Sequence, residues 1–131
     1  MLNGFLVLNK PAGFTSHDAV AKLRGILKMR RIGHAGTLDP MAEGVLVILL
    51  GVATRASEYA SGAEKEYVAG LRLGYVTDTQ DSTGAVLERH DVAAAQDDVR
   101  RAAESFLGTS SQLPPMYSAV QVGGVRLYDL A

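Results

Sequence analysis

One segment of the sequence, Gly44-Val45-Leu46-Val47-Ile48-Leu49-Leu50-Gly51, is a continuous apolar run between two glycines. A strand with one face in solvent alternates apolar and polar residues, whereas a strand covered on both faces is apolar throughout. The run is also far shorter than the roughly 20 residues that are needed to cross a bilayer. We therefore predict a central β-strand over residues 45–50, buried on both faces.

Other elements are predicted on both sides of this strand. Thr15 is expected to begin a helix, because Asp18 three residues later completes a capping box. The remaining predicted elements are strands over 5–8, 65–73 and 85–90, a loop over 31–40, a helix over 96–107 and a hairpin within 112–131. Strands that neighbour in sequence, with helices inserted irregularly, favour an α+β fold over a doubly wound one.

Composition excludes several classes of protein. The 131 residues fit one domain, and a hydrophobic share of 47% is enough for a core. The chain has no cysteine, which excludes a disulfide framework, a thiolate metal site and a cysteine nucleophile. Its three histidines are far apart and lack ligand spacing, so no metal site is expected. The apolar N-terminus lacks the basic region of a signal peptide, and we expect a soluble, cytoplasmic protein without membrane contact.

The positive charge is concentrated near the N-terminus. Residues 1–57 carry seven Lys and Arg against three Asp and Glu, whereas residues 58–131 carry six against eleven. Five basic residues fall within ten positions with no acid among them: Lys22, Arg24, Lys28, Arg30 and Arg31. Such a patch can follow the phosphates of a nucleic acid. The alternative is a solvated helix face, which charge alone slightly favours.

Residues 31–40, Arg-Ile-Gly-His-Ala-Gly-Thr-Leu-Asp-Pro, carry the candidate chemistry. Glycines allow the backbone to approach a ligand closely, and Pro40 disfavours the helical conformation at Asp39. A single carboxylate is thus presented on a stiffened turn just before a buried strand, as a reacting group requires. The alternative is that Asp39 only caps a turn, as Asp-Pro often does, and the residues alone favour it.

Four motifs in order resemble the TruB family of pseudouridine synthases. They are KPAGFTS at 10–16, GHAGTLDPMAEGVLVILLGVATR at 33–55, KEY to LG at 65–74 with TDT and the following turn to Gly84, and PPMYSA at 114–119 with RLY at 126–128. Because they spread across nearly the whole chain, a chance match is improbable. The resemblance implies the pseudouridine synthase fold, an α+β fold with a mixed, largely antiparallel sheet flanked by helices.

The resemblance implies roles for individual residues. Asp39 falls on the family's catalytic aspartate, Tyr67 on a tyrosine that stacks on the flipped-out uracil, and His34 on a histidine that holds the tRNA T-loop. The alternatives are a core aromatic for Tyr67 and a loop histidine bonded to nearby backbone for His34. Lys10 is interpreted as support for a loop and Thr15 as a helix cap.

The activity that the resemblance implies is isomerisation of the T-loop uridine at position 55 of tRNA. The N1–C1′ bond is broken and the base is rejoined through C5, with no cofactor and no metal. The carboxylate could attack C6, attack C1′ or remove the C2′ proton, and the sequence does not choose among these routes. The implied partner is the tRNA T-arm, bound by a monomer, with Lys22, Lys28, Arg30 and Arg31 as candidate contacts to the RNA backbone. A non-catalytic RNA-binding module and an RNA-guided member of the family remain as alternatives.

Members of the family are longer than this chain. The resemblance implies that residues 1–131 are the N-terminal part of the catalytic domain, with residues 112–131 the start of an RNA-gripping thumb. The remainder of that domain and a PUA domain would be absent, and with them the arginine that pairs with the catalytic aspartate. We therefore expect the 131-residue chain alone to be inactive.

Overall fold

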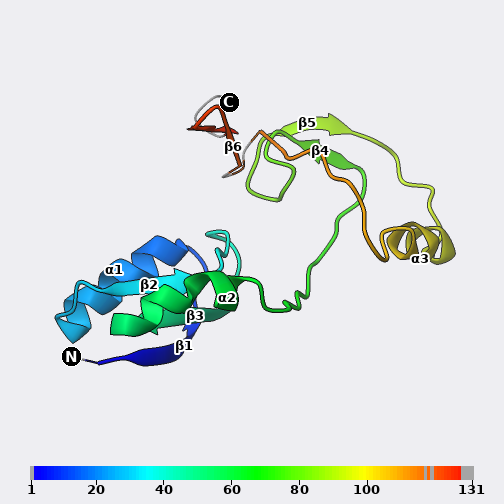
Figure 1. Cartoon of the computed structure of the whole chain (residues 1–131). Helices are drawn as coiled ribbons and strands as arrows, with labels where there is room; N and C mark the ends of the chain where they lie inside the picture. The colour runs from blue at the N-terminus through cyan, green and yellow to red at the C-terminus, as the bar shows by residue number, and fades with distance from the viewer. Residues whose placement is uncertain (1, 117, 119, 128–131) are drawn as a thin grey trace. The chain divides into compact units, whose positions relative to one another are not determined.

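The computed structural model describes residues 2–116, 118 and 120–127 (Figure 1). The chain forms two compact units, Met1–Val68 and Ala69–Ala131. That both units belong to one catalytic domain stays a prediction. None of the helices in the described ranges is long and apolar enough to cross a membrane.

The first unit is built on a three-stranded antiparallel sheet with the order β1-β3-β2. Its strands are β1 (Gly4–Lys10), β2 (Ile32–Ala35) and β3 (Gly44–Leu50). β3 pairs along its whole length with β1 and, over its C-terminal half, with β2. The prediction of a central strand is therefore confirmed. Burial on both faces holds only for the end of β3, where Ile48 and Leu49 are fully buried, whereas Val45 near its start is exposed.

Helix α1 (Ser16–Leu27) packs against one face of this sheet (Figure 1). The buried cluster between them consists of Ala19, Val20, Ile32, Leu46, Ile48 and Leu50. The predicted capping box is confirmed: the Thr15 hydroxyl accepts from the Asp18 amide at 3.0 Å, and the Asp18 carboxylate accepts from the Thr15 amide at 2.9 Å. Such a cap stabilises a helix by about 1 kcal/mol. The helix ends at Lys28, which takes a left-handed conformation with φ 51°.

The strand predicted over residues 5–8 is longer than expected and only half-buried. Leu6 and Leu8 pack on the core, while Phe5 and Val7 on the opposite face are exposed. After β3 come the 3₁₀ helix η1 (Gly51–Ala56) and the short helix α2 (Ser57–Ser61). Gly51 is required at this junction because it has φ 58° and a Cβ there would collide with the Asn3 side chain.

The prediction that residues 31–40 form only a loop is wrong for their first half. Residues 32–35 form β2, with Ile32 opposite Leu50 and Ala35 opposite Val47. Ile32 and Ala35 are both buried. Strand pairing and burial at these two positions outweigh the weak strand preference of the intervening Gly33. The loop proper begins at Gly36.

The second unit consists of short elements that are held together locally. Its elements are β4 (Tyr75–Thr77), β5 (Val86–Arg89), α3 (Gln96–Glu104), β6 (Gln121–Val122) and β7 (Val125–Arg126). β4 pairs with β5 and β6 with β7, both antiparallel. These pairs confirm the predicted hairpin near the C-terminus and the strand within 85–90. An α+β class is therefore confirmed.

Two predictions are wrong, the strand over residues 65–73 and the full length of the helix over residues 96–107. Residues 65–73 form no strand, because no neighbouring strand pairs with their backbone in the described chain. Helix α3 ends at Glu104 instead of residue 107, and all of its residues are exposed. Apolar periodicity predicted both elements, but periodicity alone does not supply the surface against which an element packs.

Candidate active site

The connection between β2 and β3 carries Asp39, and its backbone is anchored on both sides of this residue. The Leu38 amide donates to the Ser16 hydroxyl at 2.9 Å, and that hydroxyl lies 3.3 Å from the Leu38 carbonyl, to which it donates. On the other side, the Gly13 amide donates to the Pro40 carbonyl at 2.8 Å. The two motifs at residues 10–16 and 33–55 therefore meet at Asp39.

Lys10 adds a second contact on the far side of Asp39. Its side chain is fully buried, and its ammonium donates to the carbonyls of Pro11, Phe14 and Pro40 at 2.9, 2.6 and 3.4 Å. An ammonium is costly to bury unless its hydrogens are bonded, and three carbonyls match its three donors. The interpretation of Lys10 as support for a loop is confirmed.

The Asp39 side chain contrasts with its anchored backbone. The residue is exposed, and its own carbonyl accepts from the Ala42 amide at 3.0 Å, which closes the turn. Within the part of the chain that the structure describes, the carboxylate makes no hydrogen bond or ion pair. A fixed backbone with an accessible carboxylate is the arrangement that a reacting group needs. The catalytic role of Asp39 stays a prediction.

His34 lies in β2, and its ring is bonded to the start of the same loop. Nδ1 is 2.6 Å from the Gly36 carbonyl. Because a carbonyl oxygen only accepts, Nδ1 carries the hydrogen of this bond, and Nε2 takes no part in it. The bond to nearby backbone matches the structural alternative for His34, and it also orients Nε2 for a ligand.

Tyr67 is not the core aromatic that was the alternative to a substrate-binding role. Its side chain is 63% exposed, and the residue lies outside any strand. The segment that precedes Tyr67 lies close to the loop that carries Asp39. A Cβ built on Gly36, at the start of that loop, would lie 3.6 Å from Cε of Lys65. The ammonium of Lys65 donates to the Ser61 and Ala63 carbonyls at 2.6 and 3.2 Å.

The model of the TruB family pseudouridylate synthase N-terminal domain matches residues 24–131. The chain belongs to this family.

Two curated relatives agree with this match. A protein of Oenococcus oeni named tRNA pseudouridine synthase B is 52% identical over 133 residues, which cover 100% of this chain and 45% of that protein. A Bacillus subtilis protein of the same name is 47% identical over 135 residues, covering 100% and 43%. The chain thus spans less than half the length of these relatives.

The solved structure of a Cbf5–Nop10–Gar1 complex contains a chain with a similar fold. It matches 90% of this chain and 31% of its own length, with a TM-score of 0.60 and 30% identity. The α+β, largely antiparallel pseudouridine synthase fold is therefore confirmed for this TruB-family chain.

The five basic residues from Lys22 to Arg31, here called the basic run, are exposed but differ in their contacts. Arg24 donates to the Ile32 carbonyl at 2.8 Å and Arg31 to the Thr54 hydroxyl at 3.0 Å. The Lys22 ammonium lies 5.4 Å from the centre of the Phe14 ring. The side chains of two further members, Lys28 and Arg30, make no hydrogen bond or ion pair with any described residue. Their charges face solvent.

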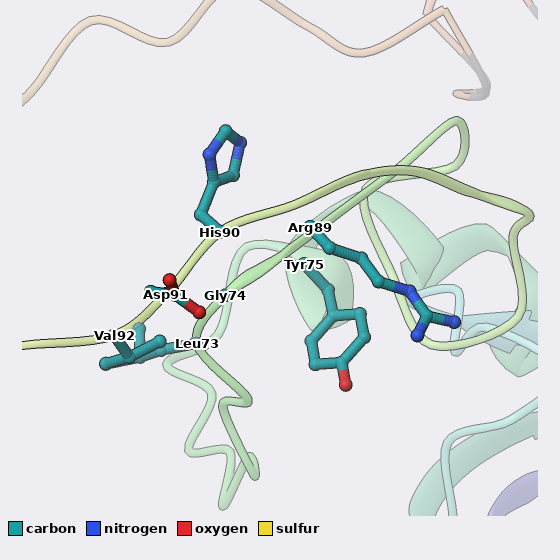
Figure 2. Close-up of a pocket in the computed structure, with 7 residues that line it drawn as sticks. All are labelled: Leu73, Gly74, Tyr75, Arg89, His90, Asp91 and Val92. Carbon is teal, nitrogen blue, oxygen red and sulfur yellow. The ribbon is translucent and has the colours of Figure 1, made fainter.

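A pocket of about 420 Å³ lies in the second unit, lined by residues 73–75 and 89–92 (Figure 2). Figure 2 shows the side chains of Tyr75 and Arg89 next to each other, with the Arg89 guanidinium 5.5 Å from the centre of the Tyr75 ring. Arg72 donates to the Tyr75 hydroxyl at 3.0 Å, and His90 contacts Glu88 at 2.8 Å. None of the site residues predicted from the sequence lines this pocket.

Two residues of the site were missed by the sequence analysis. Ser16 and Gly13 both bind the backbone beside Asp39, yet only their neighbours Thr15 and Lys10 were given structural roles. The available signal was the density of the first motif, in which five of seven residues from Lys10 to Ser16 are small or are Pro, types that suit close backbone contact.

Proposed function

We propose that this chain is the catalytic N-terminal part of a tRNA pseudouridine synthase that isomerises uridine 55 in the T-loop. The observation that carries the proposal is Asp39, whose backbone is anchored on both sides while its carboxylate faces solvent. The relatives named tRNA pseudouridine synthase B are about 50% identical over the whole chain. Their name supports a tRNA substrate over the alternative of an RNA-guided system.

The proposed reaction needs only a carboxylate and a held base. The N1–C1′ bond breaks, the uracil turns, and C5 bonds to C1′; the C5 proton leaves and N1 gains one, so the mass is unchanged. No electrons are transferred to an acceptor, and no cofactor or metal is required by this balance. Asp39 acts as nucleophile at C6 or C1′, or as base at C2′.

His34 and Tyr67 are proposed to hold the RNA around the reacting base. The target uridine must leave its stack, which costs a few kcal/mol. An exposed tyrosine ring offers a stacking surface worth about 1–3 kcal/mol, and Tyr67 has that exposure. His34 keeps Nε2 available because Nδ1 is bonded to the Gly36 carbonyl. This site supports an enzyme over the alternative of a non-catalytic RNA-binding module.

The basic run is proposed to contact the RNA backbone, with Lys28 and Arg30 contributing more than Lys22 and Arg31. The first two have no described side-chain partner, whereas Lys22 lies over Phe14 and Arg31 is bonded to Thr54. Charge reversal of Lys28 and Arg30 should weaken binding to all RNA sequences alike and flatten its salt dependence. An unchanged slope of log affinity against log salt would place this patch away from the RNA.

The proposal is tested in an extended protein, defined as this chain followed by the C-terminal part of the Bacillus subtilis relative beyond its matched residues. Asp39→Asn should lower pseudouridine formation on unmodified tRNA at least a thousandfold, measured by carbodiimide-primer extension, with binding by filter assay little changed. The matched control is Glu43→Gln, an exposed carboxylate of the same connection. Turnover by Asp39→Asn within tenfold of the unsubstituted extended protein, or no turnover by the latter, contradicts the proposal.

The 131-residue chain by itself is proposed to be inactive. A catalytic carboxylate is aimed by a cationic partner, and Asp39 has none among the described residues. We also propose that the extended protein acts as a monomer in the cytoplasm. Residues 112–131 are proposed to form the first part of an RNA-gripping thumb. A single-turnover assay of the 131-residue chain on T-loop RNA tests whether that chain is inactive. Product at a hundredth of the rate of the extended protein would contradict it.

A further inference from the structure

Ser16 occupies an unusual place between the first helix and the candidate active site. It is the first residue of α1 and only 3% exposed. Its hydroxyl bonds both backbone groups of one residue, accepting from the Leu38 amide at 2.9 Å and donating to the Leu38 carbonyl at 3.3 Å. A single side chain therefore satisfies the whole backbone of the residue that precedes Asp39.

The consequence for Asp39 follows from chain connectivity. Leu38 also packs its side chain against the buried cluster between α1 and the sheet. Leu38 is thus fixed by its side chain, its amide and its carbonyl, and only one peptide bond separates it from Asp39. Beyond Asp39, the Pro40 carbonyl is held by Gly13 and Lys10. Without the Ser16 hydroxyl, the anchor before Asp39 would rest on the Leu38 side chain alone.

We propose that Ser16 is a positioning residue for Asp39, setting the location of its carboxylate without touching the substrate. This inference rests on the proposed function, in which Asp39 reacts with the uridine. Ser16→Ala leaves the Leu38 amide without its partner, and the connection is then free to shift. Misplacing a reacting group by about 1 Å costs on the order of a hundredfold in rate. The loss should appear in the chemical step, because the surfaces proposed to bind RNA are not altered.

The control must remove a side-chain hydrogen bond to the backbone elsewhere in the same unit. Asn3 provides it, because its Oδ1 accepts from the Val52 amide at 2.9 Å. This bond lies beyond the C-terminal end of β3, whereas Asp39 precedes its N-terminal end. Asn3→Ala therefore weakens the fold without touching the connection that holds Asp39.

The kinetic experiment measures single-turnover rate constants at saturating tRNA, and dissociation constants, in the extended protein. Ser16→Ala should lower the rate constant roughly 30- to 100-fold with the dissociation constant within threefold, as expected for about 1 Å of misplacement. Asn3→Ala should stay within about threefold in both. Equal rate losses in the two variants, a rate for Ser16→Ala within threefold of unsubstituted protein, or a loss confined to binding would each overturn the proposal.

A second measurement tests the anchor independently of activity. Amide hydrogen exchange in the 131-residue chain should be at least tenfold faster at Leu38 in Ser16→Ala, and unchanged there in Asn3→Ala. Unchanged exchange at Leu38 in Ser16→Ala would overturn the proposal even if the extended protein proved inactive. If Asp39→Asn retained turnover while Leu38 exchange rose as expected, the proposed function would fail and the anchor would stand as a structural feature only.

Discussion

Each of the two units of the chain is stabilised internally, and by a different kind of interaction. Every buried residue among those described lies between Lys10 and Gly51, in the first unit, and none lies in the second. In the first unit β3 has a neighbour on each side and a helix over one face. In the second unit the strands have two to four residues, and polar turns connect them.

The turn after β4 shows how the second unit is held. The Asp81 carboxylate accepts from the hydroxyls of Thr79 and Thr83 at 2.7 and 2.5 Å and from the Thr83 amide at 2.8 Å. A Cβ at Gly84 would collide with Asp78 and Thr79, so only glycine fits there. Local hydrogen bonds of exposed groups shape this turn, whereas burial shapes the first unit.

The comparison explains where the candidate site lies. A reacting group must be held to within a fraction of an ångström, and elements supported by a buried core meet that need better than exposed turns. Asp39 lies in the connection that leads into the strand with the most buried residues, and a fully buried lysine and a buried serine bond the backbone on either side of it.

Removing a buried side chain should change the free energy of unfolding more than any other substitution considered below. Ile48→Ala should lower the free energy of unfolding by about 2–5 kcal/mol, because Ile48 is fully buried in the core of the first unit. Leu87→Ala in β5, where the side chain is 64% exposed, should change it by less than about 0.5 kcal/mol. Urea unfolding of the 131-residue chain measures both. Similar losses would show that the second unit has a core of its own.

A smaller effect is expected from removing the buried ammonium of Lys10. Lys10→Met keeps the length of the side chain but leaves the carbonyls of Pro11 and Phe14 without this donor, at about 1–3 kcal/mol. Lys65→Met is the control, because the ammonium of Lys65 also bonds two carbonyls but is exposed. Its cost should be below about 0.5 kcal/mol. Equal midpoints in thermal unfolding would contradict the role assigned to burial.

Helix caps give a third comparison. Thr15→Ala removes the cap of α1 and should cost about 1 kcal/mol. Helix α3 has alanine at the same position, Ala95, whose amide donates to Asp98 at 2.9 Å while its side chain cannot return a bond. Ala95→Ser should therefore raise the helicity of residues 96–104, read by carbon chemical shifts. Unaltered shifts there would show that α3 is limited by something other than its cap.

The sequence predicted the first unit better than the second, for a physical reason. The apolar run over 45–50 and the Thr15–Asp18 pair are local signals whose outcome the core reinforces, and both were confirmed. The expected strand over 65–73 depended on a partner strand, and none of the described residues pairs with it. Alternation predicts which face would be buried, but it does not supply the partner.

For the site, sequence motifs located the connection but not what holds it. The residues 31–40 were expected to be loop throughout, because Gly33 and Gly36 mask a strand whose pairing is decided by buried Ile32 and Ala35. Ser16 was missed because a serine beside a helix cap looks like part of the cap.

The smallest expected effect concerns the charge of Asp81 in the second unit. The hydroxyl of Thr83, then that of Thr79 and the Thr83 amide, hold the pKa of the Asp81 carboxyl below its ordinary value. Because the pKa is lower in the folded chain than in the unfolded one, the ionised carboxylate stabilises the fold above the unfolded pKa of about 3.9. That contribution is lost as the pH falls through the folded pKa.

Thr83→Val should therefore raise the pKa of Asp81 and lower stability near neutral pH, with no effect once the pH is below the folded pKa. Thr77→Val is the matched control, because the Thr77 hydroxyl donates to the Asp81 backbone carbonyl at 2.7 Å and not to its carboxylate. It should leave the pKa nearer to that of the unsubstituted chain. Titration of the Asp81 carboxyl carbon by NMR measures both variants. If the two shifts are equal, the carboxylate owes its low pKa to the shape of the whole turn, and hydrogen bonds to the charged group do not set it. The turn in the second unit would then be more rigid than its exposed side chains indicate. The two units would then differ only in that the first has a buried core.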